Sequence, residues 1–157
     1  MKLLGDFTTN VRRALDEIDP MWWSYNGLIV CGSHDPKDAE DIIKEIEVAR
    51  KNNTPVLGIC YGYQLAVIEY ARNVLDIKNA TSEEWGKGTF VVRTRPEPRI
   101  GLYQGESYWS YYDATIEAKF PENWICVPFH PEYQSHKNNP HPLLIKFINI
   151  CKHEMEM

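Results

Sequence analysis

Hydrophobic and polar residues follow two distinct patterns between positions 27 and 75. Two continuous apolar runs, at residues 27–31 and 55–60, have the composition of strands buried on both faces of a parallel sheet. Each run precedes a segment, at 38–52 or 62–75, in which apolar residues recur at steps of three and four, the spacing of an amphipathic helix. This alternation predicts a parallel α/β sheet with right-handed crossovers.

The pattern continues towards both ends of the chain and weakens in its middle. Further helices are expected at 10–18 and 143–152, and a further buried strand at 124–129. The sequence therefore predicts one α/β domain over residues 1–157, with an open, mostly parallel sheet and helices on both faces. Weaker signals predict short strands at 2–5, 89–94, 99–103 and 114–118, and a long exposed loop at 135–142.

Length and composition narrow the class of protein. The chain has 157 residues, with 17 Lys and Arg against 22 Asp and Glu, so its formal charge is −5. A modestly acidic chain without a basic run is not typical of nucleic-acid-binding proteins, and no apolar run approaches the ~20 residues of a membrane-spanning helix. The N-terminal residues become polar too soon for a signal peptide, so we expect a cytoplasmic protein that binds neither nucleic acid nor membrane.

One of the four cysteines has neighbours that favour chemistry. The cysteines show no CxxC pair and no zinc-like spacing with histidine, so neither metal nor organic cofactor is expected. Cys60 stands where a buried strand turns into a helix, between Gly58 and Gly62. A strained turn of this kind lifts a nucleophile above the carboxyl edge of the sheet, and the following helix N-terminus favours a thiolate and can hold an oxyanion. The alternative is an inert, buried cysteine.

A second motif, His130-Pro131-Glu132, follows the apolar run at 124–129. A thiol nucleophile needs a base, and the base needs a group that orients it. A histidine and a carboxylate two residues apart on an extended segment point to the same side, so His130 and Glu132 can supply both. The alternative is an exposed histidine at a strand end, and neither motif decides the question alone.

Taken together, the two motifs resemble those of a known family. The segments GICYGYQLAVIEYARNVL and FHPEYQSHKNNPHPLL are similar to the class I glutamine amidotransferase domain, and most similar to the glutaminase domain of CTP synthase. The likeness covers residues 27–85 and 124–150, with both motifs in the family's order. It implies a flavodoxin-like fold, shortened near the N-terminus and between Trp85 and Trp124.

The resemblance implies a role for each matching residue. Cys60 is expected to attack the side-chain amide of glutamine and form a thioester. His130 is expected to act as base and then as acid for the leaving ammonia, with Glu132 holding its ring. The backbone N–H groups of Gly32 and Tyr61 are expected to form the oxyanion hole. The substrate pocket is expected to include a residue that receives the substrate's α-ammonium group, Glu84, together with Gln64, Gly58 and Gly62.

Two segments depart from the family pattern. The oxyanion loop reads Cys31-Gly32-Ser33-His34-Asp35 where the family has Pro-Gly-Gly-hydrophobic-Gly, so we expect a stiffer loop with a solvated His34. Residues 105–113 match the family segment whose arginine binds the substrate α-carboxylate, but they contain no Arg or Lys. Tyrosines of this segment are alternative neutral donors, and the nearby alternative cations are Arg93, Arg95 and Arg99.

Three functions stay open on this interpretation. The first is a glutaminase that supplies ammonia to a separate synthetase or ligase chain, since 157 residues leave little room for a second active site. The second is a stand-alone thiol hydrolase of γ-glutamyl conjugates or another small amide, which the missing basic anchor favours. The third is an inactive binding subunit, against which the intact nucleophile, base and orienting carboxylate count. Association of identical chains is left open.

Overall fold

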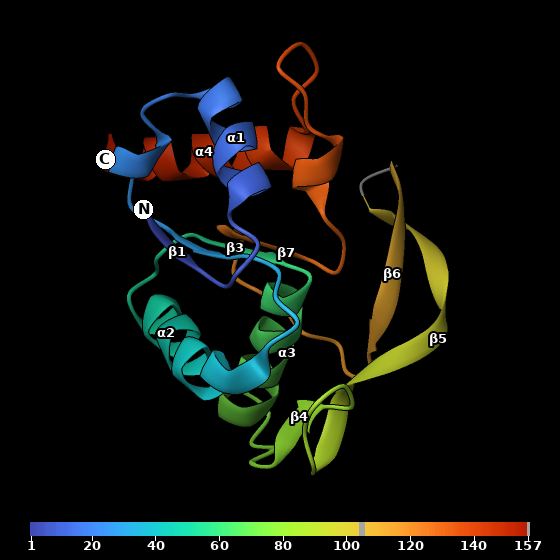
Figure 1. Cartoon of the computed structure of the whole chain (residues 1–157). Coiled ribbons are helices and arrows are strands. Elements are labelled where there is room, and N and C mark those ends of the chain that lie inside the picture. Colours follow the sequence, from blue (N-terminus) through green and yellow to red (C-terminus); the bar gives the residue numbers. More distant parts are fainter. Residues whose placement is uncertain (104–105, 157) are drawn as a thin grey trace.

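The computed structural model describes the backbone of residues 1–103 and 106–156, and the side chains of these residues except at 96, 98–103 and 106–109. Within these ranges the chain forms two sheets and four α-helices (Figure 1). The predicted buried strands and amphipathic helices are confirmed, with small shifts at their ends. The strands are β1 (Lys2–Leu4), β2 (Leu28–Val30), β3 (Val56–Ile59), β4 (Ala80–Ser82), β5 (Thr89–Tyr103), β6 (Glu106–Ala114) and β7 (Trp124–Val127). The helices are α1 (Thr9–Ile18), α2 (Ala39–Lys51), α3 (Tyr61–Asn73) and α4 (Pro142–Met155).

Four strands form one parallel sheet in the order β1-β2-β3-β7. Leu28 lies opposite both Lys2 and Val56, and Val56 lies opposite Trp124. Every residue of β2, β3 and β7 is buried, as continuous apolar runs require. Because all four strands are parallel, their carboxyl ends meet at one edge, and the segments after β2, β3 and β7 converge there.

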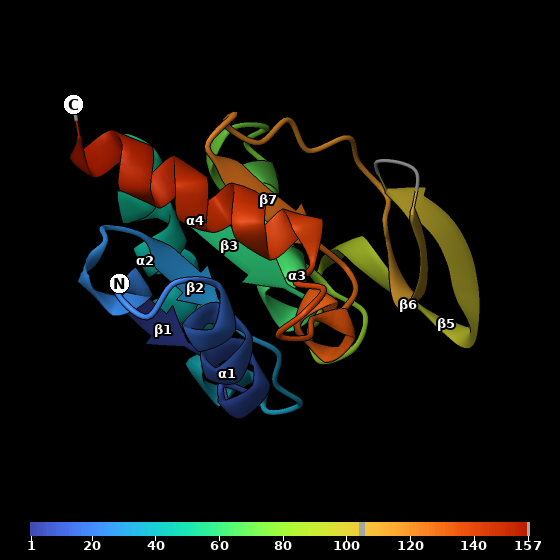
Figure 2. The ribbon, with the colours of Figure 1, turned by 90° about the horizontal axis from the view of Figure 1, so that it is seen from above.

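Helices cover both faces of this sheet, which confirms the predicted α/β architecture (Figure 1). On one face, α2 and α3 contribute Ile46 and Leu65 to the core; on the other, α1 and α4 contribute Leu15 and Phe147. All four side chains are fully buried, and burial of an aliphatic or aromatic side chain stabilises the fold by about 1.5–3 kcal/mol. Figure 2 views the sheet from the side that α1 and α4 cover. The helices on the two faces hold the sheet in place, and the sheet gives the loops at its carboxyl edge a rigid support.

A second sheet, in the order β4-β5-β6, lies beside α3 (Figure 1). The strands predicted at 89–94 and 99–103 are parts of the single strand β5, which pairs with β6 as a long antiparallel hairpin. The strand predicted at 114–118 is wrong, because β6 ends at Ala114 and Ile116 packs on the core from an irregular segment. The three-residue strand β4 carries no signal in the sequence pattern. Tyr112 of β6 packs against the core on the α3 side, so the hairpin reaches the carboxyl edge.

The segment at 135–142, predicted as a long exposed loop, is exposed only in part. Ser135 is fully buried and His141 is 6% exposed. Ser135 Oγ accepts a hydrogen bond from His141 N at 3.0 Å, while His136 and Asn139 at the tip form an isolated antiparallel bridge. The two ends of this polar segment are therefore fixed against the core, and its tip is exposed.

Candidate active site

Cys60 stands at the turn between β3 and α3, at the carboxyl edge of the parallel sheet. Its backbone φ is 54° and its ψ is −99°, a conformation that residues other than glycine rarely adopt. Such strain costs about 1–3 kcal/mol and persists where the surroundings impose it. Cys60 N donates to Val127 O at 2.9 Å, and Cys60 O accepts from Gln64 N at 3.1 Å. The cysteine is thus held in a strained turn of the kind that the sequence predicts.

Gly58 and Gly62 permit this turn because neighbouring backbone leaves no room for their side chains. A Cβ atom on Gly62 would come within 2.2 Å of Val30 O, and one on Gly58 within 3.1 Å of the Gly62 carbonyl group. The two glycines therefore let β2, β3 and the start of α3 pack closely together. These contacts are with protein backbone, and the expected contact of either glycine with substrate stays a prediction.

His130 follows β7 and lies beside Cys60. His130 Nδ1 and Glu132 Oε2 are 2.9 Å apart, and the imidazole also hydrogen-bonds the Cys60 side chain. Burial by itself lowers the pKa of His130, but hydrogen bonds to Cys60 and Glu132 and the negative charges of both groups together raise it to about 9. His130 is thus protonated at neutral pH. The fold brings together the three residues that the two motifs nominate.

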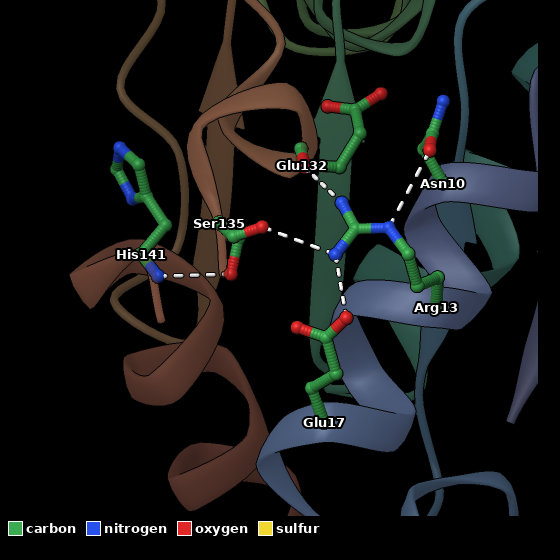
Figure 3. Close-up of polar contacts among 6 residues, drawn as sticks. All are labelled: Asn10, Arg13, Glu17, Glu132, Ser135 and His141. Atoms are coloured by element: carbon green, nitrogen blue, oxygen red, sulfur yellow. Dashed lines mark hydrogen bonds and ion pairs between the residues drawn. The ribbon is translucent and has the colours of Figure 1, made fainter. Parts of the chain in front are cut away.

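Arg13 of α1 fixes the turn that carries Glu132 (Figure 3). Its guanidinium group donates to Glu132 O at 3.0 Å and to Ser135 O at 3.1 Å, and it pairs with Glu17 at 2.7 Å. One planar cation thereby holds two backbone carbonyls of the chain that follows His130. The Glu132 side chain is fully buried, and its Oε1 has no hydrogen-bond partner among the described residues. Its orientation therefore depends on its backbone and on His130.

Gly32 lies against His130, and Tyr61 directly follows Cys60. A Cβ atom on Gly32 would lie 2.8 Å from His130 Cε1, so the loop after β2 passes directly against the imidazole. Tyr61 is the first residue of α3, and the first N–H groups of a helix have no partner within it. Ser33, which replaces the family's second glycine, donates from Oγ to Asp6 Oδ2 at 2.6 Å. The loop is therefore tied down, as expected from its sequence.

A cavity of about 160 Å³ lies next to these groups. Gln64, which is 1% exposed, accepts from Ser82 Oγ at 2.8 Å and donates to Glu84 Oε2 at 3.1 Å. Gln64 therefore orients the Glu84 carboxylate from within the core. His34 is exposed, as expected, and is in edge contact with Phe7. The residues that line the cavity are Ser33, His34, Pro36, Tyr61, Glu84 and Trp85.

The hydroxyl group of Tyr61 has no hydrogen-bond partner among the described residues. Its side chain is 2% exposed and lines the cavity. A buried polar group left without a partner costs about 1–3 kcal/mol, so this hydroxyl lowers the stability of the fold. Burial, and then the negative charges of nearby carboxylates, raise the pKa of Tyr61 to about 12; these carboxylates belong to Asp38, Asp35, Asp6 and Glu84.

Two of the three basic residues that the sequence offers as a carboxylate anchor, Arg93 and Arg95, are not among the described residues on the cavity wall. Arg93 is exposed, with its guanidinium 3.7 Å from Glu83, and Arg95 is paired with Asp113. Within the described part of the chain, the residues that line the cavity include no Arg or Lys. The side chain of Arg99 lies outside the described residues, as do those of Tyr108 and Trp109 in the segment at 105–113.

Two residues of this arrangement have no distinguishing signal in the sequence. Arg13 lies 119 positions from Glu132, and the helical period predicts only that its side of α1 is polar. Tyr112 donates from its hydroxyl to Glu84 at 3.4 Å and also hydrogen-bonds Cys60, yet it is one of several tyrosines in its segment. Only their contacts with elements distant in the sequence identify these two residues as part of the site.

Other reactive groups are sparse in the described part of the chain. All four cysteines are free, and Cys60 alone among them is not fully buried. Burial raises the pKa of Cys31, Cys126 and Cys151 to about 12. The described residues hold no group of three or more His, Cys, Asp or Glu placed to bind a metal ion. None of the helices in the same ranges has both the length and the apolar character to span a membrane.

Comparison with known proteins identifies the class to which this fold and site belong. The sequence model of the glutamine amidotransferase class-I family matches residues 6–111. The chain therefore belongs to the class I glutamine amidotransferase family. CTP synthase of Thermomicrobium roseum is 28% identical over 87% of this chain and 35% of that protein. CTP synthase of Methanoculleus marisnigri is 49% identical over 46% of this chain and 14% of that protein.

A solved structure matches the whole fold. The glutaminase domain of Trypanosoma brucei CTPS, with bound acivicin, superimposes with a TM-score of 0.76 and covers 97% of this chain and 93% of that chain, at 17% identity. This match confirms the predicted fold, and the curated relatives confirm the resemblance to CTP synthase. The chain spans about a third or less of the length of the two curated CTP synthases.

Proposed function

We propose that this chain is a glutaminase, which hydrolyses the side-chain amide of glutamine through a thioester on Cys60 and supplies ammonia to a partner synthetase. The observation that carries the proposal is the strained Cys60 at the head of α3, hydrogen-bonded to His130 with Glu132 on the far side of the ring. Family membership supports it. We place the protein in the cytoplasm, where free glutamine is available.

The first half of the reaction forms the thioester. With the proton on His130, the sulfur of Cys60 attacks the amide carbon, and the carbonyl electron pair moves to the oxygen. The N–H groups of Gly32 and Tyr61 hold this oxyanion. The C–N bond then breaks, and His130 gives its proton to the nitrogen, which leaves as ammonia.

The second half releases glutamate. Neutral His130 takes a proton from water, the water oxygen attacks the thioester, and the C–S bond breaks to restore the Cys60 thiolate. Glu132 holds the imidazole in one tautomer and stabilises its cationic form. Glu84 receives the α-ammonium group of the substrate. Each step uses residues of this chain and needs no cofactor.

A stand-alone amide hydrolase is the second candidate function. The lining of the cavity favours it, because no Arg or Lys is among its described residues and both Arg93 and Arg95 are engaged by carboxylates. A charge-assisted hydrogen bond contributes about 1.5–3 kcal/mol, so its loss weakens the preference for a free α-carboxylate. A γ-glutamyl conjugate or another small amide would then meet the same nucleophile. An inactive binding subunit is the least favoured, because the strain at Cys60 would serve no purpose.

Amide hydrolysis is tested with purified protein and a panel of amides. With glutamine, we expect the wild type to release ammonia and glutamate in equal amounts and Cys60→Ala to release neither. Cys151→Ala, which removes a buried thiol of α4, is the matched control and should retain activity. Turnover of γ-glutamyl amides without turnover of glutamine would select the second candidate. Release of no ammonia from any amide would contradict both. Copurification with a nucleotide-dependent ligase would support the proposed supply of ammonia to a partner synthetase.

A further inference from the structure

Tyr112 of β6 lies where the hairpin meets the candidate nucleophile. Its hydroxyl group donates to Glu84 Oε1 across 3.4 Å, and its side chain also hydrogen-bonds Cys60. The other oxygen of Glu84 is held by Gln64 at 3.1 Å. One phenol thus bridges the sulfur that would attack the amide and the carboxylate that would receive the ammonium group.

A substrate that reaches from Cys60 to Glu84 must pass this hydroxyl. With its amide carbon at the sulfur and its ammonium group at Glu84, the α-carbon and its remaining substituent come next to Tyr112. An arriving ammonium group also competes for the Glu84 oxygen that Tyr112 bonds in the free protein. The phenolic O–H then needs another acceptor, because an unpaired polar group is costly.

The hydroxyl keeps its proton in this environment. Burial, followed by the negative charges of Cys60 and Glu84 and the hydrogen bonds to both, raises the pKa of Tyr112. The side chain is therefore a neutral donor at every physiological pH. It packs against the core cluster that includes Tyr61 and Leu65, which holds the ring in place while its hydroxyl contacts Glu84.

We propose that Tyr112 determines substrate specificity, because its hydroxyl donates a neutral hydrogen bond to the acceptor on the α-carbon of the substrate. The inference rests on the proposed function, since it requires an amide that spans Cys60 and Glu84. A neutral donor bonds a carboxylate more strongly than a carboxamide oxygen, but it discriminates between them less than a cation does, because a cation adds the attraction between opposite charges. The substrate class is therefore a γ-amide with an α-ammonium group and either a charged or an uncharged acceptor at the α-carbon.

Three amides with the same spacing between amide carbon and amino group distinguish the loss of this hydrogen bond from a general disturbance of the site. Glutamine carries a carboxylate at the α-carbon, L-glutaminamide carries a carboxamide, and 4-aminobutanamide carries hydrogen. We expect the wild type to use the first two with kcat/KM values within about tenfold of each other. Tyr112→Phe keeps the ring and removes the donor, so it should lower kcat/KM about tenfold for these two, chiefly through KM. For 4-aminobutanamide, which has no acceptor at the α-carbon, the loss should be distinctly smaller.

Two further variants sharpen the comparison. Tyr111→Phe is the matched control, because this neighbour on β6 is 54% exposed, and it should leave all three substrates unaffected. Tyr112→Arg should shift the ratio of kcat/KM values at least about tenfold towards glutamine over L-glutaminamide, because a cation prefers the carboxylate. An equal loss on all three amides with Tyr112→Phe, or no loss on any, would overturn the inference and leave the proposed glutaminase intact.

A binding measurement covers the case of a wild type without turnover. Calorimetry would compare Cys60→Ala with the double variant Cys60→Ala/Tyr112→Phe, for glutamine and for 4-aminobutanamide. A wild type without turnover contradicts the proposed function. The inference is still supported if glutamine binds about tenfold more weakly to the double variant while 4-aminobutanamide binds equally to both variants. Equal binding by the two variants, or no binding of glutamine by either, would overturn the inference.

Discussion

The backbone of Gly32 lies directly against the ring of His130. A Cβ atom at position 32 would stand 2.8 Å from His130 Cε1 and 3.7 Å from its Nε2. Real Cβ atoms do not approach neighbours as closely as 2.8 Å, so a side chain here would displace either the loop or the imidazole. Because Gly32 is also the proposed source of an oxyanion N–H, this contact couples the base to the oxyanion hole.

Gly32→Ala should therefore reduce activity far more than stability. Loss of one oxyanion donor lowers kcat about a hundredfold or more, and displacement of His130 would add to the loss. Overpacking should lower the free energy of unfolding by about 1–3 kcal/mol. Ammonia release and chemical denaturation measure the two effects. Gly27→Ala is the control, because its Cβ would meet the flexible Met1 Sδ at 2.9 Å, away from the site. Wild-type kcat in Gly32→Ala would contradict the proposed role of this loop.

The raised pKa of His130 predicts how activity depends on pH. The imidazolium form is the proposed acid for the leaving ammonia, so kcat/KM should fall as pH rises through about 9. Glu132→Gln removes one of the negative charges that raise this pKa, so the alkaline limb should move to lower pH. Rates measured between about pH 6 and 10 would locate the limb in both proteins. An alkaline limb at the same pH in Glu132→Gln would show that Glu132 does not act on His130.

Arg13 predicts a loss of activity from a residue remote from the reacting atoms. Arg13→Gln removes the donors to Glu132 O and Ser135 O, so the turn that carries Glu132 should loosen. We expect kcat/KM to fall about tenfold and the alkaline limb of the pH profile to shift downwards with the weakened carboxylate contact. Arg12→Gln is the control, because it removes the same charge from an exposed neighbour that lies over Trp22. A lower free energy of unfolding with an unchanged pH profile would assign Arg13 a purely structural role.

The sequence predicts those parts of the fold and site whose signals are local. The apolar run Val56–Ile59 predicts a buried strand, and the glycines on either side of Cys60 predict a strained turn. The long hairpin of β5 and β6 depends instead on pairing between strands, which leaves a weaker pattern in either segment. Arg13 and Tyr112 enter the site through contacts with residues far away in the chain, and no local period indicates such contacts.

The unpartnered hydroxyl of Tyr61 predicts opposite effects on stability and on substrate binding. Tyr61→Phe removes a buried polar group without a described partner, so the free energy of unfolding should rise by about 1 kcal/mol. The side chain of Tyr61 lines the cavity together with Glu84, so the same change should raise KM for glutamine. Denaturation and steady-state kinetics on one preparation measure both effects. A variant that is less stable than the wild type, with an unchanged KM, would mean that the hydroxyl is satisfied within the protein.

The most direct test of a thiol active site is the reaction of the four cysteines with a glutamine analogue that carries an electrophilic carbon in place of the amide. We predict a single adduct on Cys60, found by mass spectrometry of the peptides and slowed by excess glutamine. The thiols of Cys31, Cys126 and Cys151 should stay unmodified, because burial raises their pKa values to about 12. A protein that forms no adduct on Cys60, or reacts equally at the buried thiols with no protection by glutamine, would contradict the proposed chemistry.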